Sequence, residues 1–226
     1  MPRDNHSPEQ PRARVLIVDD HPAVREALSI RISQAPDLEV CGQAEDTGDA
    51  LRLVEKSKPD VAIVDISLKT GDGIDLIKRI KSRDQHVRML VWSMYGENLY
   101  AERALRAGAN GYITKEHATD RIVEAIREVL AGKVYLSPAM TDKLLHRSVG
   151  SGRKRQNQPT IEALSDRELE VFRLIGRGVK TAEIAAQLHL SVRTVWTYRD
   201  RIREKLSLSD GAELVRNATH WVLQNE

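Results

Sequence analysis

The chain has 226 residues and is poor in several residue types, and each shortage argues against a class of protein. A single cysteine, Cys41, cannot form an internal disulfide, and its place in an apolar run favours a buried structural thiol. No apolar stretch approaches the roughly 20 residues of a membrane span. The N-terminus also lacks the apolar core of a signal peptide. We therefore expect a cytoplasmic protein that does not bind a membrane.

Aromatic residues are also few, and the net charge is small. Aromatics make up only 4% of the chain, which indicates cores packed from aliphatic side chains, and hydrophobic residues at 41% are enough to build such cores. The formal net charge of +2 is too small to indicate a nucleic-acid partner by itself. The chain is long enough for two domains and too long for one typical small domain.

Short, nearly all-apolar runs rich in β-branched residues recur in the first half of the chain. Runs at 15–18, 38–41, 61–64, 89–92 and 111–114 alternate with helical patterns at 23–34, 49–57, 74–82, 99–107 and 119–131. Such runs are typical of parallel strands that are buried on both faces. The alternation of strand and helix predicts an α/β fold, a doubly wound parallel sheet of five strands.

Polar residues follow four of these runs at the point where each strand ends. They are Asp19, Asp20, Asp65, Ser93 and Lys115. The carboxyl ends of parallel strands meet at one edge of a sheet, where open α/β sheets place their sites. Three carboxylates favour a hard divalent cation, Mg²⁺ or Mn²⁺. A hydroxyl and an ammonium group can stabilise the oxygens of a phosphoryl group.

An Asp carboxylate can attack phosphorus and become an acyl phosphate. Asp65 stands alone at its strand end and is the candidate phosphoacceptor, whereas the pair Asp19-Asp20 suits metal binding. Taken singly, such an Asp is more often a turn or helix-cap residue, and Lys115 or Ser93 is more often an ordinary loop residue. Five such residues in this order are hard to explain as caps. Together they predict an aspartyl-phosphate switch.

Residues 14–131 resemble the receiver domain of a bacterial two-component response regulator, and these five residues match the family's five site positions. Asp72-Gly73 matches the family's Asp-Gly turn. The resemblance implies a flavodoxin-like sheet, a sensor histidine kinase as partner and the Ser67 backbone carbonyl as a further metal ligand. It also implies that Tyr112 is the switch aromatic. The family usually has proline at the position of Lys69, so we expect a more mobile loop after Asp65.

The last third of the chain has a helical pattern throughout. Expected helices span 166–177, 181–189, 192–206 and 210–224, and Ser165 with Glu168 forms a capping box before the first of them. A short helix, a tight turn and a longer helix are the elements of a helix-turn-helix. We therefore expect a smaller all-α domain of four helices after the α/β domain.

The third of these helices has one apolar side and an opposite polar face. Val192, Val195, Ile202 and Leu206 share the apolar side. The candidate DNA-contacting residues lie on this helix and at the start of the preceding one: Lys180, Thr181, Arg193, Thr194, Trp196, Thr197, Tyr198, Asp200 and Arg201. Such a face suits a major groove. The alternative is an ordinary solvated helix face.

Residues 164–223 resemble the LuxR-type helix-turn-helix of NarL/FixJ-class regulators. The match runs through 164–171, 183–185, Ser191, 194–195 and 205–206. This resemblance implies binding to double-stranded DNA as a homodimer, with RNA polymerase as a further candidate partner. The chain departs from the family at Trp196, Tyr198 and Asp200, where relatives often carry basic residues or histidine, so no relative's target sequence can be transferred.

These features predict a tail over 1–12, a receiver domain over 13–132, a linker over 133–160 and a DNA-binding domain over 161–226. The expected protein is a transcriptional regulator controlled by phosphorylation, and not an enzyme. One alternative is a metal-dependent aspartyl-phosphate phosphatase, although Ser67 stands where such an enzyme needs a second Asp as general acid. The other alternative is a regulator whose helical domain binds protein instead of DNA.

Overall fold

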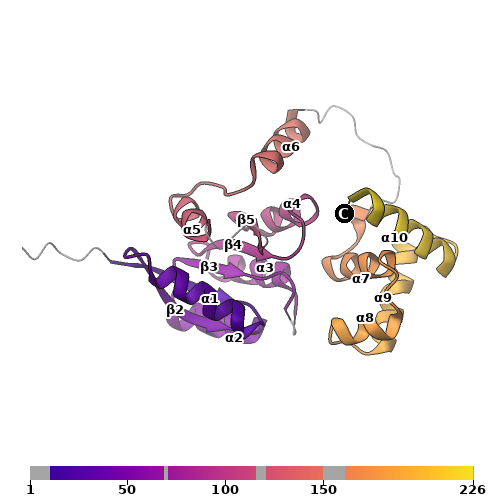
Figure 1. The fold of residues 1–226 in the computed structure, drawn as a ribbon, viewed down its shortest axis with the longest axis horizontal. Helices are drawn as coiled ribbons and strands as arrows, with labels where there is room; N and C mark the ends of the chain where they lie inside the picture. Colours follow the sequence, from indigo (N-terminus) through magenta and orange to yellow (C-terminus); the bar gives the residue numbers. More distant parts are fainter. Residues whose placement is uncertain (1–10, 69–70, 116–120, 150–160, 226) are drawn as a thin grey trace, which may run out of the picture. The chain divides into compact units, whose positions relative to one another are not determined.

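The structure is a computed structural model that describes residues 11–68, 71–115, 121–149 and 161–225. The chain divides into two compact units, residues 1–146 and 147–226 (Figure 1). Most of the expected tail, Lys69, the start of the expected helix at 119 and the linker stretch 150–160 lie outside the described residues.

The first unit contains one parallel sheet of five strands in the order β2-β1-β3-β4-β5. The strands are β1 (Ala13–Val18), β2 (Leu38–Ala44), β3 (Val61–Val64), β4 (Arg88–Ser93) and β5 (Gly111–Thr114). Every neighbouring pair is parallel. The predicted doubly wound α/β fold is therefore confirmed. Strand β3 lies in the middle of the sheet, so Asp65 follows a strand that is buried on both faces.

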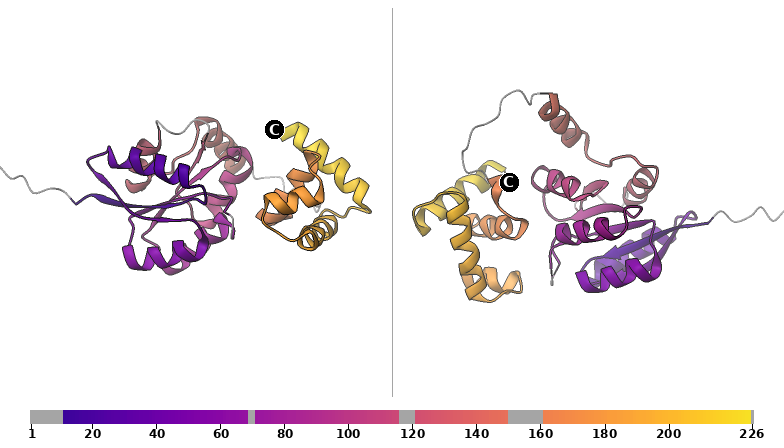
Figure 2. Two further views of the ribbon diagram at one scale, coloured as in Figure 1. Left: turned by 60° about the horizontal axis from the view of Figure 1, so that its bottom comes forward. Right: turned by 180° about the vertical axis from the view of Figure 1, so that it is seen from behind.

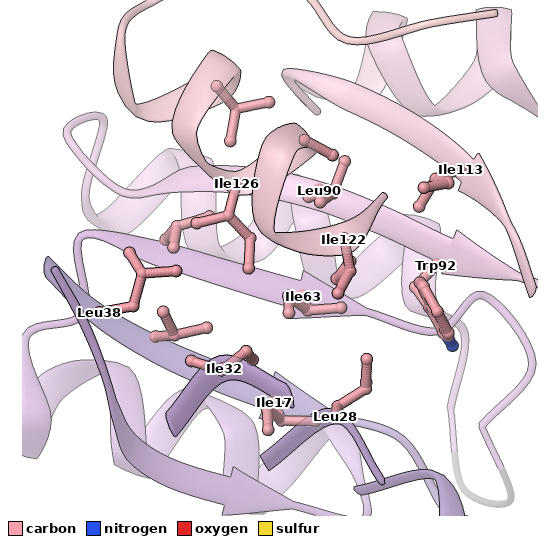
Figure 3. Packing of buried hydrophobic residues seen from close by; sticks show 14 of the residues in the cluster. Ile17, Leu28, Ile32, Leu38, Ile63, Leu90, Trp92, Ile113, Ile122 and Ile126 are labelled. Atoms are coloured by element: carbon pink, nitrogen blue, oxygen red, sulfur yellow. The ribbon is translucent and has the colours of Figure 1, made fainter. Parts of the chain in front are cut away.

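Five helices connect and cover the strands: α1 (Pro22–Ser33), α2 (Thr47–Ser57), α3 (Gly73–Arg83), α4 (Glu97–Ala107) and α5 (Ile122–Leu130). Successive residues of a strand point to opposite faces, so each strand supplies two cores. On one face, Ile17, Ile63 and Leu90 pack against α1 and α5 (Figure 3). Helices lie on both sides of the sheet, as Figure 2 makes visible. These layers exclude water from the strands and leave their carboxyl ends as the accessible edge.

Strand β2 forms one edge of the sheet, and this position corrects the expectation for Cys41. The thiol is unpaired and partly exposed instead of buried, because β2 is bonded to β1 alone. The remaining burial still raises the pKa of the Cys41 thiol above its usual value. A raised pKa lowers the thiolate fraction, which agrees with a structural residue.

A short segment after α5 continues along the edge of β5. The backbone N–H of Tyr135 donates to the carbonyl of Asn110 at 3.0 Å, and the carbonyl of Tyr135 accepts from the N–H of Tyr112 at 2.8 Å. Helix α6 (Pro138–Val149) follows, and the Ser137 hydroxyl accepts from the N–H of Met140 at its start, at 3.1 Å. The first residues of the expected linker are therefore tied to the receiver unit.

The second unit is helical, as predicted. It contains the 3-10 turn η2 (Ile161–Ala163) and helices α7 (Asp166–Gly176), α8 (Thr181–Gln187), α9 (Val192–Lys205) and α10 (Gly211–Asn225). The predicted capping box is confirmed, because Ser165 N donates to Glu168 Oε2 at 2.7 Å and Glu168 N donates back to Ser165 Oγ at 3.4 Å. Within the described ranges, no helix combines the length and apolar character that a membrane span requires.

Helix α9 buries Val195 and Ile202 completely, but it does not bury Val192. Val192 is 46% exposed, although it lies on the same side of the helix as these two residues. Three residues along a helix turn the direction of a side chain by about 300°, which places Val192 about 60° away from Val195. At the first turn of the helix, this angle is enough to leave the side chain in solvent.

Candidate functional site

Lys115 joins two carboxylates at the carboxyl edge of the sheet. Its Nζ lies 2.7 Å from Asp19 Oδ2 and 2.7 Å from Asp65 Oδ2. Asp19 and Asp65 are only 1% and 3% exposed. Burial lowers the pKa of Lys115, but the two carboxylates outweigh this effect and hold the pKa above its usual value. The charged form of Lys115 is therefore favoured between these two buried carboxyl groups.

Asp65 is fixed by hydrogen bonds to backbone groups of β1 and of the loop that follows it. Its N–H donates to the carbonyl of Val18 at 2.9 Å, and its Oδ1 accepts from the N–H of Ser67 at 3.2 Å. Gly73 packs directly against the Asp65 carbonyl, since a Cβ at position 73 would lie 2.1 Å from that oxygen. Asp72 caps α3 through Ile74 N at 2.7 Å. The Asp-Gly pair therefore sets the close approach of α3 to the loop after Asp65.

The burial of Asp65 has an electrostatic consequence. Burial and, less strongly, the nearby Asp19 raise the pKa of Asp65 to about 6, against the lowering effect of Lys115. Both effects disfavour the charged carboxylate. A group that adds positive charge beside Asp65 would relieve this cost.

Asp19, Asp20, His21 and Asp65 form one cluster in which a ligand atom from each lies within 4.8 Å of the others. Within the described part of the chain, Asp20 Oδ1 is buried and accepts no hydrogen bond, although His21 Nδ1 lies at ion-pair distance, 2.8 Å. A buried carboxylate oxygen that accepts no hydrogen bond is suited to a cation. The acidic cluster therefore fits a divalent metal ion.

Two residues beside this cluster, His21 and Arg25, were not predicted as site residues from the sequence. His21 contacts Asp20 and also lies 3.3 Å from Asp19 Oδ1, and Arg25 Nη1 donates to the Asp19 carbonyl at 2.7 Å. The position of His21 directly after the acidic pair was a usable signal. Arg25 lies one turn into α1, and no pattern in the sequence marks its contact.

Ser93 and Tyr112 meet beside the same edge. Ser93 is fully buried, and its Oγ accepts from the N–H of Tyr95 at 3.2 Å. Tyr112 is 1% exposed, and its hydroxyl donates to the Tyr95 carbonyl at 2.8 Å. Burial raises the pKa of the Tyr112 hydroxyl well above its usual value, so the group stays protonated.

The Tyr95 side chain extends from this turn towards the phosphoacceptor loop. Its hydroxyl donates to Ser67 Oγ at 3.3 Å, and its ring stacks on Tyr100 with centroids 4.9 Å apart. The side chain therefore links β4, α4 and the loop that follows Asp65.

The second unit presents the candidate DNA-contacting residues on α9 and at the start of α8. Arg193, Trp196, Thr197, Asp200, Arg201 and Lys180 are exposed, and Thr181, Thr194 and Tyr198 are partly exposed. Ser191 caps α9 by accepting from Thr194 N at 3.0 Å. Asp200 pairs with Arg203 at 2.8 Å, so this carboxylate is already partly neutralised.

Comparison with known protein families agrees with this site. Residues 15–127 match the response regulator receiver domain, and residues 162–218 match the bacterial regulatory proteins of the luxR family. The chain therefore belongs to the two-component response regulators that carry a LuxR-type DNA-binding domain.

Individual relatives cover nearly the whole chain. The response regulator GacA of Pseudomonas aeruginosa is 34% identical over 89% of this chain and 92% of its own length. The oxygen regulatory protein NreC of Staphylococcus carnosus is 35% identical over 91% of this chain and 96% of its own length. RcsB of Salmonella enterica serovar Typhimurium, solved bound to the promoter rprA with the phosphomimetic BeF₃⁻, is 27% identical over 92% of this chain and 98% of that structure, with a TM-score of 0.59.

Proposed function

We propose that Asp65 accepts a phosphoryl group from a sensor histidine kinase. An Asp65 carboxylate oxygen attacks the phosphorus, the bond between phosphorus and the kinase imidazole nitrogen breaks, and that nitrogen keeps the electron pair. The observation that carries this proposal is the pairing of buried Asp65 with Lys115 at 2.7 Å. Lys115 would neutralise charge that develops on the phosphoryl oxygens.

Asp19, Asp20 and Asp65 with the backbone carbonyl of Ser67 would hold Mg²⁺ or Mn²⁺. When bound, the cation would supply positive charge to the phosphoryl oxygens. Asp20 Oδ1, which accepts no hydrogen bond from any described residue, supports this assignment. Asp19 already interacts with Lys115, so Asp20 is the better candidate for direct coordination.

The switch would pass from Ser93 to Tyr112. Ser93 Oγ would donate a hydrogen bond to a phosphoryl oxygen, and the Tyr112 hydroxyl donates a hydrogen bond to the Tyr95 carbonyl in the turn that follows Ser93. Phosphorylation then favours one arrangement of β5 and α4 over another, which shifts a population of states. Residues 13–132 would form this receiver, 133–160 the connection and 161–226 the output domain.

The output domain would bind double-stranded DNA as a homodimer, with α9 in the major groove. Arg193 and Arg201 on α9 are exposed, and neither has an ion-pair partner among the described residues, so both are available for phosphates. The DNA complex of RcsB, a relative, supports this proposal. Such a regulator would act in the cytoplasm, with RNA polymerase as a candidate partner.

Phosphorylation is tested with acetyl phosphate and Mg²⁺, and with candidate kinases. We expect one acid-stable, base-labile phosphoryl group on the parent protein and none on Asp65→Asn. Asp60→Asn is the matched control, because Asp60 lies at the opposite end of β3 and is exposed. Undiminished labelling of Asp65→Asn would show that a different residue is the phosphoacceptor. Lys115→Ala should accept the label but transmit a weaker response.

DNA binding is tested by titration with genomic fragments over a range of salt concentrations. Arg193→Ala should weaken binding to all sequences alike and reduce the slope of log K against log salt by about one unit. Arg79→Ala, an exposed arginine on α3, is the control and should leave the slope unchanged. A parent protein that captures RNA polymerase but binds no fragment would favour the protein-binding alternative. Turnover of phosphate monoesters that depends on Asp65 would favour the phosphatase alternative.

A further inference from the structure

Helix α9 exposes one large aromatic side chain, that of Trp196. The residue is 52% exposed, although Val195 beside it is fully buried. Isolated exposed apolar residues are common and need no explanation by themselves. Trp196, however, lies on the proposed DNA-contacting helix, and the side chains around it indicate what its ring contacts.

The indole ring of Trp196 is held in place by a neighbouring cation. The guanidinium carbon of Arg199 lies 5.0 Å from the centroid of the ring, within the range of a cation–π interaction. Arg199 is itself only partly exposed, so its contact with the ring limits the rotation of the ring. A side chain that is already oriented loses less conformational entropy when it binds. The rest of the ring remains available to a partner.

Charged side chains on the same helix indicate the partner. Arg193 precedes Trp196 by three residues and Asp200 follows it by four, so the three share a face of α9. Arg193 has no ion-pair partner within the described ranges, whereas Asp200 is paired with Arg203 at 2.8 Å. The apolar ring is therefore placed between a cation that is free to meet a phosphate and an ion pair. This combination suits a polyanion with an apolar group in its groove.

We propose that Trp196 is a specificity-determining residue that contacts the 5-methyl group of thymine in the major groove. Among the four bases, thymine alone presents a methyl group there. The indole offers an apolar edge and a single donor, its N–H, and it has no acceptor for the amino groups of adenine or cytosine. The inference rests on DNA binding by α9. It adds to that function the base that one named residue recognises.

The experiment begins with selection of a DNA site by the full-length protein. Each thymine of the selected site is then replaced singly by uracil, which removes only the methyl group, and the dissociation constant is measured at fixed salt. We expect one thymine per half-site at which uracil weakens binding by about fourfold, the effect of one methyl group removed from contact. Trp196→Ala should bind the thymine and uracil sites with equal affinity at that position.

Two further variants separate recognition from stability. Trp196→Phe keeps an apolar ring and should restore part of the sensitivity to uracil. Ile30→Ala removes an exposed apolar side chain from α1 of the receiver and should retain the full sensitivity of the parent protein. Circular dichroism should give the same helix content for all variants, because Trp196 and Ile30 are both more than half exposed.

Loss of the uracil effect at one position in Trp196→Ala alone supports the proposal. Equal sensitivity of the parent protein and Trp196→Ala to uracil at every position overturns it, as does a Trp196→Ala variant whose loss of affinity is the same for all sequences. If the parent protein selects no DNA at all, the DNA-binding function itself fails, and this result is distinguishable from failure of the Trp196 proposal alone.

Discussion

Replacement of Gly73 by alanine tests how tightly the phosphoacceptor loop is held. The added Cβ would lie 2.1 Å from the carbonyl oxygen of Asp65 and 2.7 Å from the Cα of Ile66. Both neighbours are backbone atoms, so no rotation of a side chain can relieve the overlap. The Gly73 N–H also donates to the carbonyl of Ile66 at 3.0 Å, which ties the start of α3 to the same loop. The loop and α3 must therefore move apart.

Overpacking of this kind costs about 1–3 kcal/mol and occasionally more, and contacts with backbone place Gly73→Ala near 3 kcal/mol. For a domain of this size, such a loss lowers the melting temperature by about 10 °C. Calorimetry of the full chain should show the receiver transition at this lower temperature. Because Asp65 shifts as well, labelling by acetyl phosphate should be slower.

The matched control is Gly96→Ala at the N-cap of α4, where an added Cβ meets nothing within 4 Å. This change should cost less than about 1 kcal/mol, the usual difference between Gly and Ala at a helix N-cap. A melting temperature of Gly73→Ala within about 1 °C of the parent protein would refute the reasoning. In that case the close approach of α3 to Asp65 is not rigid.

Three further predictions concern other contacts. Tyr95→Ala should shorten the lifetime of the acyl phosphate, because the ring beside the phosphoacceptor loop obstructs water; an unchanged rate of phosphate loss would contradict this shielding. Burial raises the pKa of Glu168, whereas the hydrogen bond from Lys205 at 2.6 Å and the hydrogen bonds with Ser165 in the capping box lower it. The lowering effects outweigh burial, so the pKa of Glu168 lies below its usual value. The ionised Glu168 therefore stabilises the folded C-terminal unit at a pH above the ordinary glutamate pKa, and this stability is lost as the pH falls through the lowered pKa of Glu168. Glu168→Gln should flatten the acidic part of a plot of unfolding free energy against pH. Glu97→Ala removes the acceptor of the Ser137 N–H at 2.8 Å and should speed amide exchange at the start of α6, whereas Glu97→Gln should largely preserve the protection.

Much of the fold could be predicted from local patterns. Apolar runs at 15–18 and 61–64 became β1 and β3, because a strand that is buried on both faces needs apolar residues at successive positions. The capping box at Ser165 was predicted from two residues three positions apart, since its geometry is local. Such features depend on residues that are close in the sequence, and they can therefore be predicted from the sequence.

Other features depend on which segments meet in space. Cys41 was expected to be buried, and it is partly exposed because β2 lies at the edge of the sheet, a fact that strand order decides. Val192 lies on the same side of α9 as Val195, but its position at the first turn of the helix leaves it 46% exposed. The bond from Ser137 N to Glu97 spans 40 residues, and no periodicity indicates it.

The sequence alone determined which chemical groups stand at the strand ends, because each apolar run is followed directly by its polar residue. On that basis, Asp65 and Lys115 could be predicted to act in the same phosphoryl-transfer site. Only the tertiary structure decided that a single ammonium group lies 2.7 Å from both Asp19 and Asp65, and that an oxygen of Asp20 accepts no hydrogen bond from any described residue. Burial and electrostatics are properties of the packed sheet edge, where segments distant in the chain exclude water together, and no single segment carries them.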